Sequence, residues 1–337
     1  MAMITKVKSP EQMKCNNCGK EESVVELRYC GLKLCAGCYI RFFEKRVVRT
    51  IVENFYIEAN DNICVGLSGG KDSMVALYLL NKFNNRTGRR ARIFALTIDH
   101  GIDGYDEILM NNAKSLCQKI GIEQYVFSFK DEIGHTIDEI ARIRPGLCNC
   151  GVFRRHVLNK KARDLGATKL ATGHNLDDEA ESVLMNFISG DVRRIMRGDG
   201  LVLDQKFVRR IKPLRRCPES EVLVYARLRF PDMDFALTCP YRGGVIRMDV
   251  KKMTDQLERS HPGIRFQILE SSEKFRQALL GKSVIASEIN ECELCGEPTS
   301  RRICNSCQLR IEINGIVERF PKQIEADARA SSVAGMS

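Results

Sequence analysis

Short apolar runs alternate with segments of helical periodicity through the middle of the chain. Four apolar runs predict buried β-strands, at residues 62–67, 93–98, 125–127 and 169–172. Helices are predicted between and after them, at 74–80, 108–120, 153–165 and from 177 onward. This βαβα order implies an α/β fold with a doubly wound parallel sheet and helices on both faces. Ligands in such sheets bind beyond the carboxyl ends of the strands, at the switch point.

Weaker helical patterns follow residue 205, at 219–229, 250–259 and 273–280. We expect four segments: an N-terminal cysteine knuckle with a linker helix, the α/β domain, a C-terminal cysteine knuckle and a disordered tail. Their predicted bounds are 1–50, 51–285, 286–325 and 326–337.

Composition favours a soluble globular protein. Of 337 residues, 44% are apolar and 28% charged, and no run of about 18 apolar residues suggests a membrane span. Residues 1–8 lack the apolar stretch and cleavage site of a secretory signal. We therefore expect no membrane partner and a cytoplasmic location.

The net charge of +10 favours an anionic partner such as nucleic acid, although simple solubility remains the alternative. Basic residues concentrate at 193–197, 209–212 and 215–216. Charge alone does not choose between RNA and DNA.

The chain has fifteen cysteines, and eight of them form Cys-x2-Cys pairs, two near each end. Two intervening residues let a turn aim both sulfurs at one ion, and four thiolates are the pattern of closed structural zinc sites. The predicted ligands of two structural Zn²⁺ are Cys15, Cys18, Cys35, Cys38, Cys292, Cys295, Cys304 and Cys307. Reduced free cysteines or a further iron–sulfur centre are the alternatives. The knuckles either cap the core or contact RNA.

The segment Ser68-Gly69-Gly70-Lys71-Asp72-Ser73 lies where a predicted strand ends and a helix begins. Backbone amides and the helix dipole favour a phosphate at such a place. Glycines permit close approach, Lys71 adds a positive charge, and Asp72 is suited to Mg²⁺. The spacing is not that of the Walker motif.

This segment resembles the loop of the PP-loop ATP-pyrophosphatases, which cleave ATP between the α and β phosphates and adenylate a carbonyl oxygen. Residues 173–180 (Gly-His-Asn-Leu-Asp-Asp-Glu-Ala), 151–155 (Gly-Val-Phe-Arg-Arg) and 239–241 (Cys-Pro-Tyr) resemble the TtuA and Ncs-type tRNA 2-thiouridine synthetases. The related TtcA enzymes act on cytidine and are not expected to carry both knuckles, so uridine is favoured. The resemblance also implies a homodimer.

The resemblance implies that ATP is bound by Leu67, Ser68, Gly69, Gly70, Lys71, Asp72, Ser73, Ile98, Asp99, Arg154 and Gly173. It implies catalytic roles for Asp72, Arg154 and Asp178, with Asp178 near the reacting base. Asp178 also suits a plain helix start, because acids near a helix N-terminus are stabilised by the dipole. We interpret His100 and His174 as ordinary hydrogen-bonded turn histidines.

The family binds a [4Fe-4S] cluster through three cysteines, and the matching residues here are Cys148, Cys150 and Cys239. Cys148 and Cys150 are separated by one residue, whereas the family has two, so the loop after Pro145 must bend. Cys217 has no family counterpart and is a substitute if one ligand fails. A persulfide route through Cys150 and Cys239 is the alternative.

The implied reaction is ATP-dependent tRNA 2-thiolation, in which the uridine C2 oxygen is adenylated and sulfur then displaces AMP. The sulfur donor is a ubiquitin-like thiocarboxylate protein or inorganic sulfide. Two other functions remain open: a PP-loop tRNA ligase without sulfur chemistry, and a zinc-ribbon RNA-binding module without hydrolysis. The sequence does not show which uridine is modified.

Overall fold

A computed structural model describes residues 14–144, 150–197, 207–241, 246–279 and 289–319. Its centre is a parallel sheet of five strands in the order β5-β4-β3-β6-β7. The strands are β3 (Asn62–Gly66), β4 (Arg92–Asp99), β5 (Glu123–Ser128), β6 (Lys169–Ala171) and β7 (Arg209–Ile211). In register, Val65 of β3 lies between Ala95 of β4 and Ala171 of β6. After β3 the chain adds β4 and β5 on one side, and then β6 and β7 on the other side. The switch point therefore lies between β3 and β6, and the predicted fold class is confirmed.

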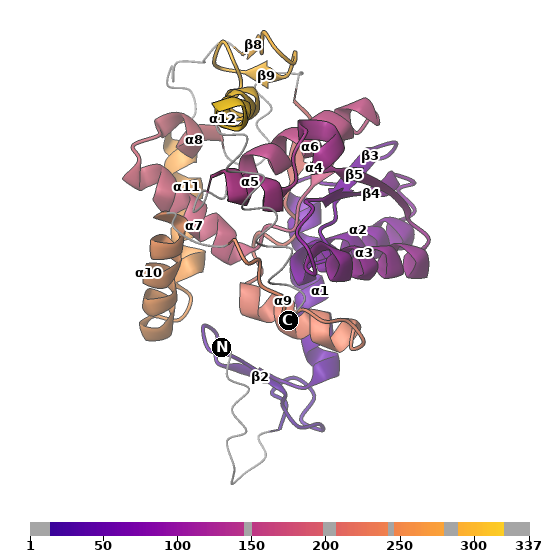
Figure 1. Cartoon of the computed structure of the whole chain (residues 1–337). Coiled ribbons are helices and arrows are strands. Elements are labelled where there is room, and N and C mark those ends of the chain that lie inside the picture. Colours follow the sequence, from indigo (N-terminus) through magenta and orange to yellow (C-terminus); the bar gives the residue numbers. More distant parts are fainter. Residues whose placement is uncertain (1–13, 145–149, 198–206, 242–245, 280–288, 320–337) are drawn as a thin grey trace, which may run out of the picture.

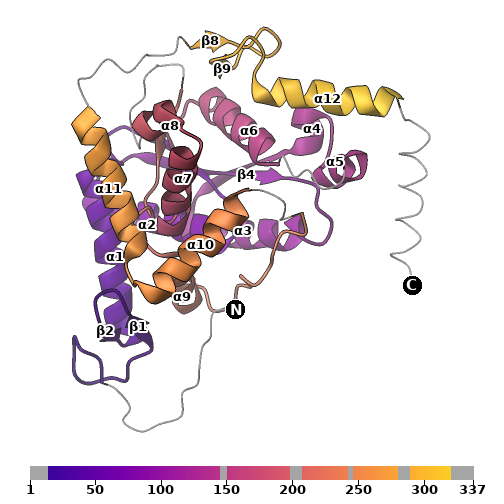
Figure 2. The same cartoon turned by 90° about the vertical axis from the view of Figure 1, so that its left-hand side faces the viewer.

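Helices cover both faces of the sheet (Figures 1 and 2). One face carries α1 (Ala36–Glu53), α2 (Lys71–Thr87), α3 (Asp106–Ile120) and α9 (Glu219–Arg229). The other carries α4 (Phe129–Ile133), α5 (Ile137–Ile143), α6 (Cys150–Asp164) and α12 (Asn305–Arg319). The division follows the alternation of side chains along a strand. In β3, Ile63 and Val65 pack in the first core and Cys64 in the second.

A further group of helices packs beside the end of the sheet (Figure 2). It comprises α7 (Leu176–Ile188), α8 (Val192–Arg197), α10 (Ile246–Ser260) and α11 (Ile264–Leu279). Both α10 and α11 pack against α7, which follows β6. This arrangement brings α10 and α11 to the carboxyl edge of the sheet.

The predicted helices and strands are present, with shifts at their ends. Gly121 and Gly166 lie just beyond α3 and α6 in the left-handed conformation, at φ 67° and 69°, which ends a helix without the strain a side chain would cause. The helices α10 and α11 begin earlier than the patterns at 250–259 and 273–280 predict. The short helices α4 and α5 and the strand β7 were not predicted.

Two of the predicted basic clusters each contain a cation that is ion-paired within the fold. Arg215 is 4% exposed, and its Nη1 lies 2.7 Å from Glu273 Oε1. Lys212 Nζ lies 2.6 Å from Glu179 Oε1. The basic run 209–212 lies largely in the edge strand β7, and its Lys212, like Arg215, is less available to a nucleic acid than its charge suggested.

The two knuckles relate differently to the core. The first contains β1 (Val25–Leu27) and β2 (Leu32–Leu34), and three of its four paired cysteines belong to the same hydrophobic core as α1 and α2. The second contains β8 (Asn290–Glu291) and β9 (Pro298–Thr299), and its buried cysteines form a separate small core. The predicted domain bounds stay predictions, and the tail 326–337 lies outside the described residues. Within the described ranges, none of the helices has both the length and the apolar character needed to cross a membrane.

Candidate active site

The nucleotide loop, residues 68–73, turns from β3 into α2. Gly69 has φ +77°, and a Cβ there would lie 1.8 Å from the carbonyl oxygen of Leu109. Only glycine therefore fits this position. Gly70 is the N-cap of α2 and supplies no side-chain cap, so the first amides of the helix remain available to an anion. The Ser73 hydroxyl accepts from Ser68 N at 3.0 Å and donates to Gly70 O at 3.0 Å, which holds the turn closed.

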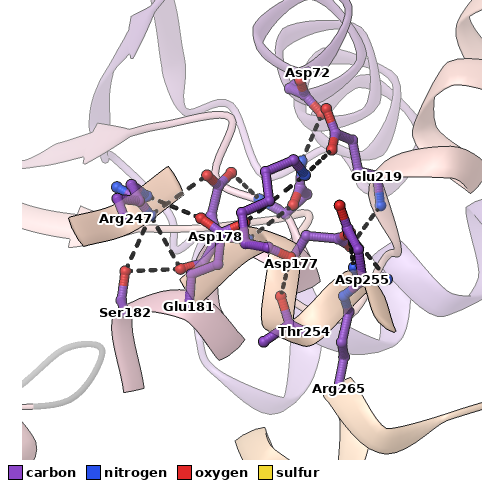
Figure 3. Close-up of polar contacts among 12 residues, drawn as sticks. Asp72, Asp177, Asp178, Glu181, Ser182, Glu219, Arg247, Thr254, Asp255 and Arg265 are labelled. Atoms are coloured by element: carbon purple, nitrogen blue, oxygen red, sulfur yellow. Dashed lines mark hydrogen bonds and ion pairs between the residues drawn. The ribbon is translucent and has the colours of Figure 1, made fainter. Parts of the chain in front are cut away.

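Charges surround the start of α2 (Figure 3). Lys71 Nζ lies 2.9 Å from Asp72 Oδ2 and 3.1 Å from Glu219 Oε1. Burial opposes ionisation of Glu219, but Lys71 and Lys251 outweigh it and lower its pKa to about 2. Burial raises the pKa of Asp72, although Lys71 and Asn175 act in the opposite direction. The Lys71 ammonium is thus held beside the loop by two carboxylates.

Gly173 follows β6 and packs against the loop. A Cβ at this position would lie 2.6 Å from Ser73 N and 2.7 Å from the Asp72 carbonyl carbon. We expected glycine here so that a nucleotide could pass close to the backbone. The structure adds another reason, because a side chain would displace the first turn of α2.

Asp178 occupies the third position of α7 in a capping box. Its Oδ2 accepts from Asn175 N at 3.2 Å, while Asn175 Oδ1 accepts from Asp178 N at 3.1 Å. The Asn175 amide also donates to Asp72 Oδ1 at 3.0 Å. The helix-start interpretation is therefore confirmed, and the same contacts link Asp178 to the loop.

The helix α10 adds two cations that the sequence analysis did not single out, Arg247 (Figure 3) and Lys251. Arg247 Nε donates to Glu181 Oε2 at 2.9 Å, and its Nη2 lies 3.6 Å from Asp178 Oδ1. Lys251 Nζ donates to Glu219 Oε2 at 2.9 Å. The only signal in the sequence was their spacing of four residues on one helical face.

A cavity of about 240 Å³ opens where β3, β4 and β6 end. Eight of the predicted site residues line it: Leu67, Ser68, Asp72, Ser73, Ile98, Arg154, Gly173 and Asp178. Gly69, Gly70, Lys71 and Asp99 lie outside the lining. Asp99 accepts a hydrogen bond from Gly101 N at 2.8 Å and so shapes the turn after β4.

Arg247, His100 and His174 also line the cavity. His174 Nδ1 lies 2.8 Å from Thr172 Oγ1, and burial lowers the pKa of its imidazole to about 4. His100 Nδ1 lies 3.0 Å from Asp106 Oδ1, as expected of a turn histidine. Its Nε2 is buried and has no hydrogen-bond partner among the described residues.

Comparison with known proteins identifies the chain. Residues 43–234 match the model of the PP-loop domain family. The tRNA-5-methyluridine(54) 2-sulfurtransferase of Pyrococcus horikoshii is 34% identical, over 90% of this chain and 96% of that protein. The chain belongs to the TtuA/Ncs-type tRNA 2-thiolation family of PP-loop proteins. Another relative, cytoplasmic tRNA 2-thiolation protein 1 of Saccharomyces cerevisiae, is 33% identical, over 98% of this chain and 93% of that protein.

A solved structure of the same family supports the fold. The U34-tRNA thiolase NcsA from Methanococcus maripaludis, determined with its [4Fe-4S] cluster, matches with a TM-score of 0.74 and 33% identity. The match covers 91% of this chain and 96% of that one.

Two of the three predicted cluster cysteines fall in the described part of this family member. Cys150 begins α6, Cys239 precedes the Pro240-Tyr241 turn, and both pack half-buried against the same hydrophobic core. Tyr241 donates to Asp138 Oδ1 at 2.7 Å, which ties this turn to α5. Cys148 lies outside the described residues. Cys217 is fully buried in the opposite core, where burial raises the pKa of its thiol to about 12, so it is not placed to replace a cluster ligand.

The knuckle cysteines meet in two sets of four, and the sulfurs of each set lie within 4.8 Å of one another. Tetrahedral zinc with Zn–S bonds of about 2.3 Å requires sulfurs about 3.8 Å apart. Cys18 and Cys35 Sγ are 3.9 Å apart, and Cys295 and Cys304 Sγ are 3.7 Å apart. Both sets therefore fit such an ion. Cys30 is exposed and belongs to neither set.

Proposed function

We propose that this chain catalyses ATP-dependent 2-thiolation of a tRNA uridine, by adenylating the C2 oxygen and then replacing it with sulfur. The observation that carries the proposal is the convergence of the nucleotide loop, Arg154 and Asp178 on one cavity at the switch point. Similarity to relatives named as tRNA 2-thiolation proteins extends over nearly the whole chain and supports the same proposal.

ATP would bind with its phosphates at the uncapped start of α2, where amides and the helix dipole favour negative charge. Lys71 would exchange its contact with Glu219 for a phosphate oxygen. Asp72 is the proposed ligand of Mg²⁺, which takes carboxylate oxygens and phosphates. Ile98, on the adjoining strand, would contact the adenine.

Arg154 and Asp178, which line the same cavity, would both act on the reacting groups. The uridine oxygen forms a bond to the α phosphorus, and the bond to the β phosphate breaks, releasing pyrophosphate. Arg154 neutralises charge on the α phosphate, since phosphoryl transfer depends chiefly on positioning and electrostatic stabilisation. Asp178, already held by Asn175 and Arg247, would orient the base.

In the second step, sulfur at the oxidation level of sulfide bonds to C2, the C2–O bond breaks and AMP leaves. Neither an oxidant nor a reductant is consumed. Cys148, Cys150 and Cys239 are the proposed ligands of a [4Fe-4S] cluster, which when bound would present sulfur for this attack. The half-buried placement of Cys150 and Cys239 beside one core is consistent with such a group.

Several further assignments belong to the same proposal. The two cysteine sets would hold structural Zn²⁺. The sulfur donor would be a ubiquitin-like thiocarboxylate protein or inorganic sulfide, and the chain would act as a cytoplasmic homodimer.

The deciding experiment combines anaerobically purified protein, ATP, Mg²⁺, sulfide and tRNA from a strain that lacks the gene. We expect tRNA-dependent release of pyrophosphate and a 2-thiouridine nucleoside detected by mass spectrometry. Pyrophosphate release without thiolation by a colourless protein that contains only zinc would point to the ligase alternative. Thiolation by a colourless protein without iron would show that sulfide reaches C2 without a cluster; the persulfide route would instead require a donor whose sulfur is already at the persulfide level. No pyrophosphate at all would leave only the RNA-binding module.

A further inference from the structure

A second cavity, of about 340 Å³, lies between α6, the edge strand β7 and the C-terminal knuckle. Figure 2 shows β8 and β9 above α6, with α12 extending away from them. Arg155, Arg210 and Arg301 line this cavity from three separate elements. The nucleotide cavity is distinct, but α6 borders both, because the adjacent residues Arg154 and Arg155 line one cavity each.

The lining contains more positive than negative charge. Its carboxylate, Glu297, is 6% exposed and is paired with the Arg163 guanidinium, whose Nη1 donates at 3.2 Å. Arg210 donates to a neutral acceptor, Asn159 Oδ1, at 3.1 Å. Over the described ranges, no ion pair to a carboxylate is found for Arg155, Arg210 or Arg301. Burial, and then the neighbouring Arg155, lower the pKa of Arg210.

The start of α12 contributes to the same wall. This helix has 15 residues, and its first two, Asn305 and Ser306, line the cavity. Ser306 is 3% exposed, lines the cavity, and its Oγ has no hydrogen-bond partner in the described part of the chain. A buried hydroxyl without a partner is uncommon and calls for an explanation. A bound anion would accept its hydrogen bond.

We propose that this cavity binds a phosphodiester group of the tRNA backbone, through Arg155, Arg210 and the α12 N-terminus with Ser306. Guanidinium groups and helix N-termini are the donors that phosphate oxygens prefer. The inference rests on tRNA being the substrate. Three cations from three elements suit a polyanion better than a single protein carboxylate, and the exposed Arg155 and Arg301 leave the cavity accessible to a large ligand.

The site gives the C-terminal knuckle a function beyond capping. Arg301 and Ser306 belong to the knuckle region and meet Arg210 of the catalytic sheet, so a bound phosphate would bridge both parts. Since α6 also supplies Arg154 to the nucleotide cavity, a phosphate seated here would position the tRNA one helix away from the site of adenylation.

The test measures binding of unfractionated tRNA to the anaerobically purified full-length protein, without ATP, by fluorescence anisotropy at several salt concentrations. Arg210→Met keeps the apolar stem and removes the charge. We expect on the order of tenfold weaker binding, with the slope of log K against log salt falling by about 0.7 to 0.9. Ser306→Ala should weaken binding about threefold without lowering thermal stability, because it removes an unpartnered hydroxyl.

Arg302→Met is the matched control. Arg302 lies on the same knuckle but is exposed, outside the cavity lining and paired with Glu293 at 2.8 Å. Equal losses in Arg302→Met and Arg210→Met would indicate diffuse attraction and overturn the site. Unchanged tRNA affinity in both Arg210→Met and Ser306→Ala would also overturn it. Inorganic phosphate or a carboxylate-ended peptide bound in an Arg210-dependent way, with tRNA affinity unaltered, would assign the cavity to another ligand.

These measurements do not involve sulfur transfer. If thiolation fails while tRNA binding depends on Arg210, the phosphate site stands and the proposed reaction falls. If tRNA is thiolated but the Arg210→Met and Ser306→Ala variants bind it as tightly as the unchanged protein does, only the phosphate site is refuted.

Discussion

Lys71 of the nucleotide loop lies 3.1 Å from Glu219, the first residue of α9, a helix that packs against α2 on the same face of the sheet. The carboxylate holds the ammonium in place before a nucleotide arrives. It also competes with the phosphates that the ammonium is positioned to meet. The strength of this ion pair therefore affects two properties: how well the loop is ordered before ATP binds, and how readily the Lys71 ammonium can contact a phosphate.

Removing the competing carboxylate should strengthen nucleotide binding. We expect Glu219→Gln to tighten ATP binding about threefold to tenfold, since a negative charge near the phosphates is lost. Lys71→Met should weaken binding by on the order of tenfold or more. Calorimetry with ATP and Mg²⁺ in the absence of tRNA measures both. Weaker binding by Glu219→Gln would show that the carboxylate chiefly organises the loop.

The loop glycine should tolerate no side chain. Gly69→Ala places a Cβ 1.8 Å from Leu109 O, so we expect a loss of at least about 2 kcal/mol in unfolding free energy and no measurable ATP binding. Gly88, the C-cap of α2, has φ +62° but no atom within 4 Å of its Cβ position. Gly88→Ala should cost only about 1 kcal/mol and leave ATP binding intact. Denaturant titration compares the two, and similar losses would contradict the steric explanation.

Mild acid should destabilise the protein through His174. Burial lowers the pKa of this imidazole from 6.5 to about 4. Between these values the unfolded chain binds a proton and the folded chain does not, so stability falls as pH drops, by up to about 1.4 kcal/mol per unit. His174→Gln should flatten the profile of unfolding free energy between pH 6.5 and 4. The exposed His261 serves as control, and an identical change in His261→Gln would refute the assignment.

Loss of metal should affect the two knuckles unequally. Cys15 lies in the main hydrophobic core with α1 and α2, whereas Cys292 lies in the separate small core. Cys15→Ser should remove one zinc and lower the main melting transition by several degrees. Cys292→Ser should remove the other zinc and leave that transition nearly unchanged. Cys30→Ser, in the same loop as the first set, should retain two zinc ions by elemental analysis.

Variants of the proposed cluster cysteines should differ from a Cys217 variant in the iron content of the purified protein. Cys150→Ala and Cys239→Ala should lose iron and acid-labile sulfide after anaerobic purification, while ATP binding remains. Cys217→Ala should keep both, because its thiol lies in the opposite core, although the small cavity lowers stability by about 1 kcal/mol. Iron loss in Cys217→Ala with retention in Cys239→Ala would reverse the ligand assignment.

The sequence by itself determined the sheet, its covering helices and the nucleotide loop. Strand and helix periodicities are local, so the buried strands β3 and β4 and the loop between Ser68 and Ser73 were visible from neighbouring residues alone. The cysteine spacing likewise predicted both sets of four sulfurs that the structure brings together. Short elements such as α5 and β7 were not predicted, because a few residues are too short a stretch to show a clear periodicity.

Only the tertiary structure decided which distant charges meet. Glu219 and Arg247 lie far along the chain from the loop, and no local pattern connects them with Lys71 or Asp178. Packing also buries Arg215 against Glu273. It places Cys217 in the core on the face of the sheet opposite Cys150 and Cys239. It brings Arg210 and Ser306 into the lining of one cavity. Long-range contacts depend on how helices pack on the sheet, and a linear pattern does not contain that information.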